Sequence, residues 1–186
     1  MHRPLLVAVL AALAPLGAGA QDGVVNPYKN VKVGDYATYT MSMKFGGLEV
    51  KGTVTNTIKA VTAKEATVEV TGTMNGMPIP PQTQKVDITK DFDPTAAGLA
   101  KNVKDAKVEK LAEGKEKLTI GDKSYEATWL TYKVTTKTPL GDVVGDVKAW
   151  VGKDIPLGLG KMEMSSLVNG MEMKMKMEQT EAGSKK

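Results

Sequence analysis

Four methionines near the end of the sequence alternate with charged residues: Met171, Met173, Met175 and Met177. Because successive side chains of a β-strand point to opposite faces, this alternation predicts a strand with thioethers on one face and charges on the other. Asn169 and Gly170 come just before it and are typical of a two-residue hairpin turn. Pairing across that turn brings Met162 and Met164 beside the strand, so six methionines share one face.

Thioether side chains gathered on one face can do one of three things. Burying a methionine side chain stabilises a fold by about 1.5–3 kcal/mol, so the face can be an ordinary sheet core. Methionine is also flexible, so the face can be the deformable wall of a cavity for a lipid-like or other apolar ligand. Thioethers also bind Cu(I), which makes soft-metal binding the third alternative. Left in water, the face would be an apolar patch, so we expect it to be covered or to bind something.

The candidate ligand-binding side chains come from both terminal hairpins and from one tryptophan. Residues 35–45 alternate in the same way, with methionines on their apolar face. Trp150 lies within a strand pattern, where a core position is favoured over a sugar-stacking platform. The candidates are Met41, Met43, Met164, Met173, Met175 and Trp150.

The composition argues against catalysis. The chain has no cysteine, and its one histidine is His2, so serine–histidine and cysteine–histidine catalysis and His-ligated zinc are excluded from the rest of the chain. The acidic group Asp87, Asp91 and Asp93 does not have the spacing of an EF-hand loop. With no activated nucleophile, base or phosphate loop in sight, we expect a protein that is not an enzyme, with no catalytic residues, no metal site and no cofactor.

The charge pattern argues against nucleic acid as a partner. The formal net charge is +4, but lysines alternate with acids along most of the chain, so no basic stripe forms. We expect no nucleic-acid binding.

The first twenty residues are typical of a secretory signal peptide. Arg3 supplies the positive start, residues 5–16 are apolar, and Ala18 and Ala20 fit the small-residue cleavage pattern. No later segment approaches ~18 consecutive apolar residues, so we expect no stable membrane insertion. The sequence therefore predicts a signal peptide over residues 1–20 and a protein that is secreted or periplasmic.

Hairpin patterns predict the fold. Residues 35–45 and 48–60 alternate on either side of Gly46 and Gly47, a turn that pairs Met43 with Val50. Three prolines in residues 77–81 restrict that segment to a sheet edge or a crossover. Asp93 is a candidate cap for a short helix over residues 94–101. The fold class is all-β with one short helix: a curved antiparallel sheet, a half-barrel or barrel-like meander of about eight or nine strands.

The domain organisation follows from the same patterns. We expect an N-terminal extension at residues 21–30, a single β-domain at residues 31–178 and a disordered tail at residues 179–186.

Two stretches resemble a known group of small secreted bacterial proteins. Residues 150–158 combine a strand-ending Trp150 with a turn that contains Pro156, Leu157 and Gly158, and residues 33–39 resemble the first strand of that group. The sequence is similar to TapB-like domains of unknown function and, more distantly, to LolA/LolB-type lipoprotein-carrier half-barrels. The resemblance implies a curved antiparallel sheet around an apolar interior, with the short helix as a plug, and it assigns no binding residue.

The sequence thus favours an exported, non-catalytic binding or carrier module that holds an apolar small molecule or lipid against a sheet. One alternative is a structural or interaction domain of the envelope with a closed core and an envelope protein as its partner. The other is a methionine-based Cu(I)-binding protein.

Overall fold

The computed structural model describes residues 26–90, 107–138, 141–168 and 170–185. The signal peptide predicted for residues 1–20 and the helix predicted for residues 94–101 lie outside these ranges. Among the described residues, no helix is long and apolar enough to cross a membrane. A 3-10 helix (Pro27–Asn30) precedes the strands.

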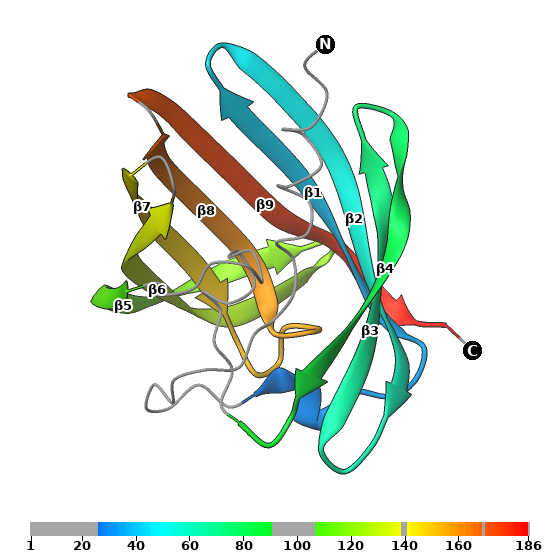
Figure 1. The fold of residues 1–186 in the computed structure, drawn as a ribbon. Coiled ribbons are helices and arrows are strands. Elements are labelled where there is room, and N and C mark those ends of the chain that lie inside the picture. Colours follow the sequence, from blue (N-terminus) through cyan, green and yellow to red (C-terminus); the bar gives the residue numbers. More distant parts are fainter. Residues whose placement is uncertain (1–25, 91–106, 139–140, 169, 186) are drawn as a thin grey trace.

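Nine antiparallel strands form one sheet that remains open, with β4 and β5 as its edges (Figure 1). The order across the sheet is β4-β3-β2-β1-β9-β8-β7-β6-β5, so β1 and β9 bring the two ends of the domain together. The strands are β1 (Asp35–Phe45), β2 (Leu48–Val61), β3 (Glu65–Met74), β4 (Met77–Asp87), β5 (Lys107–Ile120), β6 (Lys123–Thr138), β7 (Gly141–Val151), β8 (Leu159–Val168) and β9 (Met171–Ser184). The predicted all-β class and strand number are confirmed.

Turn chemistry sets the register of the two terminal hairpins as predicted. β1 and β2 pair Met43 with Val50 and Lys44 with Glu49 around the glycine turn. β8 and β9 pair Met162 with Met177 and Met164 with Met175. Gly46 and its successor both adopt positive φ, 54° and 84°, which glycine reaches without steric cost.

Each edge of the sheet is protected from further pairing in its own way. β4 contains the three prolines, which cannot donate to a neighbouring strand, so the edge position predicted for residues 77–81 is confirmed. β5 is exposed along most of its length and carries many lysines and glutamates. Charged side chains of this kind discourage edge-to-edge association.

The C-terminal tail belongs to the sheet, so the disorder predicted for residues 179–186 is wrong over most of that range. β9 continues to Ser184 and pairs with the start of β1, where Asp35 lies opposite Ser184. A bulge between Thr38 and Tyr39 adjusts the register. Main-chain hydrogen bonding does not depend on side-chain hydrophobicity, so a polar segment can still complete a ladder.

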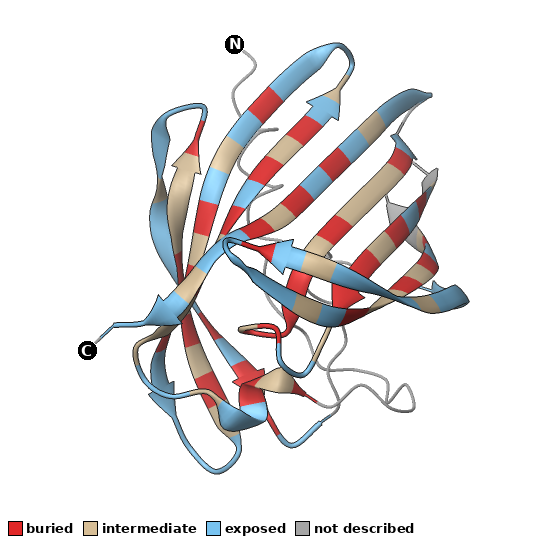
Figure 2. Cartoon of the chain, turned by 180° about the vertical axis from the view of Figure 1, so that it is seen from behind, coloured by how far each residue is buried: buried red, intermediate tan, exposed pale blue. Residues whose placement is uncertain are grey.

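The twist of the sheet carries β5 and the start of β6 across the back of β8 and β9 (Figure 2). A small second cluster of buried residues lies under this crossing: Ile120, Ala127, Trp150 and Ile155. The main core lies on the opposite face and extends from β4 to β6. Each face of the sheet therefore buries its own cluster of side chains.

Candidate functional site

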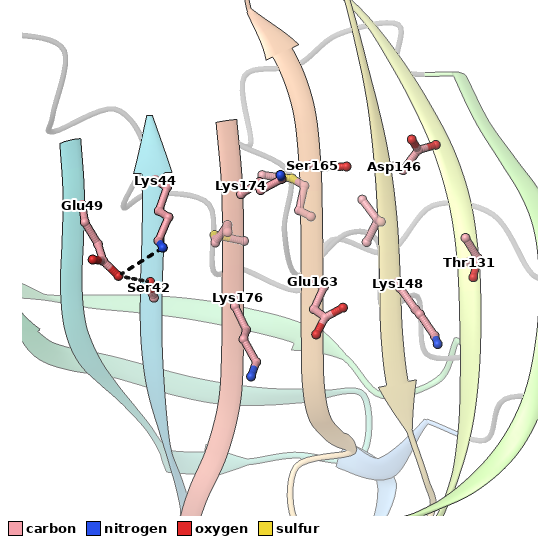
Figure 3. Close-up of a pocket in the computed structure, with 13 residues that line it drawn as sticks. Ser42, Lys44, Glu49, Thr131, Asp146, Lys148, Glu163, Ser165, Lys174 and Lys176 are labelled. Carbon is pink, nitrogen blue, oxygen red and sulfur yellow. Dashed lines mark hydrogen bonds and ion pairs between the residues drawn. The ribbon is translucent and has the colours of Figure 1, made fainter. Parts of the chain in front are cut away.

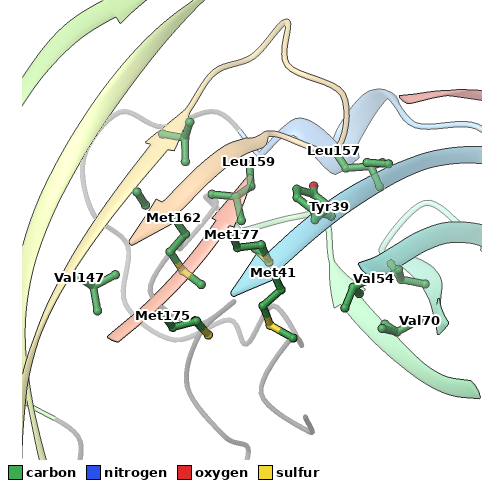
Figure 4. Close-up of a cluster of buried hydrophobic side chains, with 14 of the residues drawn as sticks. Tyr39, Met41, Val54, Val70, Val147, Leu157, Leu159, Met162, Met175 and Met177 are labelled. Carbon is green, nitrogen blue, oxygen red and sulfur yellow. The ribbon is translucent and has the colours of Figure 1, made fainter. Parts of the chain in front are cut away.

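The methionines of β8, β9 and β1 form continuous rows across three neighbouring strands. One row consists of Met162, Met177 and Met41, which are cross-strand partners. The next row toward the hairpin tips consists of Met164, Met175 and Met43. We call the side of the sheet that carries these rows the methionine face, and Figure 4 shows several of their side chains converging.

Burial along the methionine face falls from one end to the other. Met162 and Met177 are 0% and 2% exposed, whereas Met171 near the β8–β9 turn is 44% exposed. Met164 and Met173 lie between these limits. We call the end with the β1–β2, β3–β4 and β8–β9 turns the open end, and the opposite end the closed end (Figure 1). The thioethers therefore form a continuous path from the interior to the surface.

The first row extends one methionine beyond the predicted set. Gly52 pairs with both Met41 and Met74, so it separates them across the sheet. A Cβ on Gly52 would come within 3.2 Å of the Met74 sulfur, so the bare glycine leaves room for that thioether. Met74 shares a face of β3 with Val68 and Val70, but its place beside Met41 depends on the pairing of three strands.

The predicted site residues do not all meet. Met41, Met43, Met164, Met173 and Met175 share the methionine face, as the β1, β8 and β9 registers require. Trp150 does not join them. It pairs with Lys161 and packs in the small cluster on the opposite side of the sheet. Its neighbours Ala149 and Val151 take the positions on the methionine face, so alternation directs the indole away.

The closed end is sealed by the segment that precedes β1 and by the β7–β8 connection. Tyr28 and Leu157 pack into the main core there. Asn26 caps the 3-10 helix through Oδ1, which accepts from the Tyr28 N–H at 3.0 Å. Its amide group also donates to the carbonyls of Asp87 and Lys90, at 3.0 and 2.9 Å. Residue types alone gave no sign of this role for Asn26.

Two tyrosines at the closed end are buried deeply enough to change their acidity. Burial raises the pKa of Tyr28 far above its ordinary value of 10.0. Burial also raises the pKa of Tyr39 well above that value, and the nearby Tyr28 adds to the effect. Both phenols therefore stay neutral in the folded protein at all ordinary pH values.

The opposite side of the same strands is polar, and we call it the lysine face. A groove of about 510 Å³ crosses it between β2 and β6. Figure 3 shows four lysines along this groove: Lys44, Lys148, Lys174 and Lys176. Three carboxylates lie among them, namely Glu49, Asp146 and Glu163. Because the two signs alternate, the groove has no strong field of either sign.

Two ion pairs of β9 on the lysine face are exposed. Lys176 lies 3.0 Å from Glu178, and Lys174 lies 2.8 Å from Glu172. Exposed pairs of this kind contribute about 0–1 kcal/mol each. They favour solubility more than stability.

On the lysine face, lysines stack on tryptophans near the β7–β8 connection, at the closed end. The Lys148 ammonium lies 4.6 Å from the Trp129 ring centre and 4.5 Å from the Trp150 ring centre. Lys161 lies 4.3 Å from the Trp150 ring centre. The cations cover the aromatic faces, so the tryptophans are integrated into packing and are not free platforms for a sugar.

The acidic residues do not assemble a metal site in the part of the chain that the structure describes. Asp87 accepts hydrogen bonds from the main chain and the hydroxyl of Thr89, at 2.9 and 2.6 Å. These bonds, the hydroxyl one first, lower the pKa of Asp87. Asp91 and Asp93 lie outside the described residues.

No protein-family model matches this chain, and no curated protein matches its sequence. A candidate exported protein with a YmcC-like fold from Bacteroides fragilis is 10% identical, with a TM-score of 0.48 over 82% of this chain and 97% of that one. A candidate lipoprotein from Parabacteroides distasonis is 9% identical, with a TM-score of 0.49 over 87% and 100%.

The hypothetical lipoprotein YmcC from Escherichia coli is 11% identical, with a TM-score of 0.32 over 88% of this chain and 100% of that chain. The resemblance to TapB-like and LolA/LolB-type proteins stays a prediction.

Proposed function

We propose that this protein is an exported, non-catalytic module that binds an apolar, lipid-like ligand along its methionine face. Export is supported by the signal-peptide pattern of residues 1–20, which also makes a secreted or periplasmic location part of the proposal. The candidate binding residues are Met41, Met43, Met164, Met173 and Met175, to which the pairing of the strands adds Met74, Met162 and Met177.

The observation that carries the proposal is the pair of methionine rows across β8, β9 and β1 together with their rising exposure. A closed core is served as well by leucine, isoleucine and valine, which have better-defined rotamers. Methionine side chains adapt to irregular shapes. They therefore suit a surface that must pack against a bound ligand and repack against itself when the ligand is absent. The exposure of Met171 gives that surface an edge in solvent.

The open end has the character of an entrance. Leu48 and Met171 lie beside hairpin turns at this end and are 68% and 44% exposed. The two turns are neighbours, because a Cβ on Gly46 would lie 3.5 Å from the Met171 sulfur. Exposed apolar groups gathered at one end of a molecule mark a site of interaction with other apolar matter. A guest that enters there meets the half-buried Met173 and Met164 before the fully buried Met162.

The test is a fluorescence titration of the purified protein with the apolar dye N-phenyl-1-naphthylamine. We expect saturable binding that Met173→Lys and Met164→Lys each weaken at least tenfold, because a lysine in the path adds a charge that the dye would have to bury. Met77→Lys is the matched control, since Met77 is an exposed methionine on the β4 edge. Circular dichroism verifies that each variant keeps its sheet.

Absence of saturable binding would contradict the proposal and favour a structural or interaction domain of the envelope, with an envelope protein as partner. Equal weakening by all three lysine variants would also contradict it, because the dye would then be reporting a general surface effect.

Cu(I) binding is a second candidate, favoured by the lateral alignment of three thioethers in each row. Directly paired residues on neighbouring strands have Cβ atoms about 4.5–5.5 Å apart, so sulfurs of one row can converge on a soft ion. Titration with Cu(I) against a competing chelator tests it. A Cu(I) affinity that Met173→Leu and Met175→Leu leave unchanged would show that these sulfurs serve only in packing.

A further inference from the structure

Three of the buried polar side chains on the methionine face each have an oxygen without a hydrogen-bond partner. These atoms are Asn56 Oδ1, Ser166 Oγ and Gln179 Oε1, all shielded from solvent. The register assigns them to this face, because Asn56 pairs with Ala37, Ser166 with Met173 and Gln179 with Tyr39. A fourth such atom in the described part of the chain, Trp150 Nε1, lies on the other side of the sheet.

Asn56 and Gln179 lie on either side of Tyr39 at the closed end. Gln179 is the neighbour of Tyr39 on β9, while Asn56 lies two residue pairs further along β2, opposite Ala37, which is about 7 Å along the strands. Two strand spacings separate them, which is about 10 Å across the sheet. Ser166 is far from both, toward the open end, in the row that contains Met173.

The orientation of the Gln179 amide is set by a second contact. Its Nε2 donates a hydrogen bond of 3.1 Å to the Pro156 carbonyl in the β7–β8 connection. The amide nitrogen is therefore engaged, and Oε1 is the end left without a partner. A buried acceptor without a donor is unfavourable and calls for a group that supplies one.

We infer that the ligand of the methionine face is amphipathic and has an uncharged polar head that donates hydrogen bonds, such as a glycerol-like diol. This inference rests on the proposed function. The head lies beside Tyr39, where Asn56 Oδ1 and Gln179 Oε1 accept hydrogen bonds from its hydroxyl groups, and the chain follows the methionine rows toward the open end.

The chemistry of the face argues against an anionic head. Both unpartnered atoms at the closed end are acceptors, which would repel a carboxylate or phosphate. The described lysines of β1, β8 and β9, namely Lys44, Lys161, Lys174 and Lys176, all lie on the lysine face. An anion on the methionine rows would therefore have no cation from these strands beside it.

The length of the path suits a lipid chain. From Tyr39 to Phe45 the strand advances six residues, which is about 20 Å. Met41 and Met43 lie between them, with a methionine of β9 opposite each. An extended alkyl chain laid along this line would contact thioethers over its whole length.

The test compares two ligands with the same alkyl chain, one with two hydroxyl donors and one in which both hydroxyls are methylated: 1-O-dodecylglycerol and its dimethyl ether. Each displaces N-phenyl-1-naphthylamine from the purified protein, and the two affinities are compared. We expect the diol to bind about tenfold more tightly, which is the size of effect that pairing a buried acceptor produces. Gln179→Met should remove most of this preference, because it removes the acceptor that a hydroxyl of the diol would use.

Two further variants make the result decisive. Asn56→Leu tests the second acceptor and serves alone if Gln179→Met does not fold. Gln82→Met is the matched control, because Gln82 is exposed on the β4 edge.

Equal affinities for diol and ether would overturn the inference and leave the proposed function standing. A preference that both variants retain would also overturn it, since ordered water would then be serving these oxygens. If neither compound displaces the dye, and the dye itself binds, the alkyl-chain ligand class is wrong; if the dye does not bind at all, the proposed function fails.

Discussion

The two faces of β8, β9 and β1 are made from alternate residues of the same three strands, yet they have opposite properties. Met177 is almost completely buried, while its neighbour Lys176 is half exposed and paired with Glu178. One face contains aligned thioethers that lead to the open end, and the other contains ion pairs along a groove between charged side chains. Period-two alternation is enough to give one strand two different roles.

The difference indicates where stability and binding originate. Burial of thioethers contributes far more free energy than exposed ion pairs, so the methionine face should dominate stability. The lysine face presents exposed charges to solvent, and the tryptophan cluster packs on it near the β7–β8 connection. Substitutions on adjacent residues should therefore have effects of very different size.

The largest expected effect separates two consecutive residues of β9. Met177→Ala should lower the free energy of unfolding by about 2–5 kcal/mol, because it leaves a cavity between Met41 and Met162. Lys176→Ala should lower it by about 1 kcal/mol or less, because the ion pair it removes is exposed. Urea unfolding measures both. Similar losses for the two variants would contradict the contrast between the faces.

Alkaline pH should lower the free energy of unfolding, because two phenols are buried in the main core. Tyr28 and Tyr39 have pKa values raised above 10.0, so their stabilising contribution is complete below pH 10 and is lost as pH rises toward the folded-state pKa. The unfolded chain releases these protons first, so the free energy of unfolding should fall by about 1.4 kcal/mol per pH unit for each phenol.

Urea unfolding at pH values between 9 and about 11.5 measures this slope. Tyr28→Phe and Tyr39→Phe should each make it shallower. A slope that neither substitution changes would show that other groups cause the alkaline loss.

Among the charged side chains of the lysine face, we expect Lys148, which is stacked on the tryptophans, to contribute most to the free energy of unfolding. Lys148→Met should lower the free energy of unfolding by about 0.5–2 kcal/mol, because the ammonium contacts two rings. Lys174→Met is the control and should cost less, since its ion pair with Glu172 is exposed on both sides. Thermal unfolding compares them, and a larger loss for Lys174→Met would count against the stacked arrangement.

The smallest expected effect is no change at all in tryptophan fluorescence. Trp129 and Trp150 are the only tryptophans of the chain, and both belong to the cluster on the lysine face. A non-fluorescent apolar ligand on the methionine face should leave their emission maximum where it is. A clear blue shift on saturation would place the ligand on the wrong side of the sheet.

Local sequence signals predicted much of this fold. The two terminal hairpins have turn residues that set the register, and alternation then decides which side chains share a face, as for Met164 and Met175. The pairing of β1 with β9 joins segments from opposite ends of the chain, and no turn encodes it. The rows that include Met41 and Met43 therefore required the structure.

Trp150 and the tail show two further limits of sequence reasoning. Whether Trp150 faces the methionines depends on the register across the β7–β8 connection and its bulge, which composition does not determine. Residues 179–184 are polar and resemble a disordered tail, but their main chain completes the ladder of β1. The sequence could likewise not predict the unpartnered oxygens of Asn56 and Gln179, because a lack of hydrogen-bond partners depends on how the whole chain packs.

The most direct test of ligand binding on the methionine face is an NMR titration of the methionine ε-methyl groups. The chain has 11 methionines, and those on the methionine face can be assigned by single substitution to leucine. On adding N-phenyl-1-naphthylamine, we expect large shifts at Met43, Met164, Met173 and Met175 and none at the exposed Met77. Shifts confined to Met77 and Met171, with the buried methyl groups unchanged, would contradict the account.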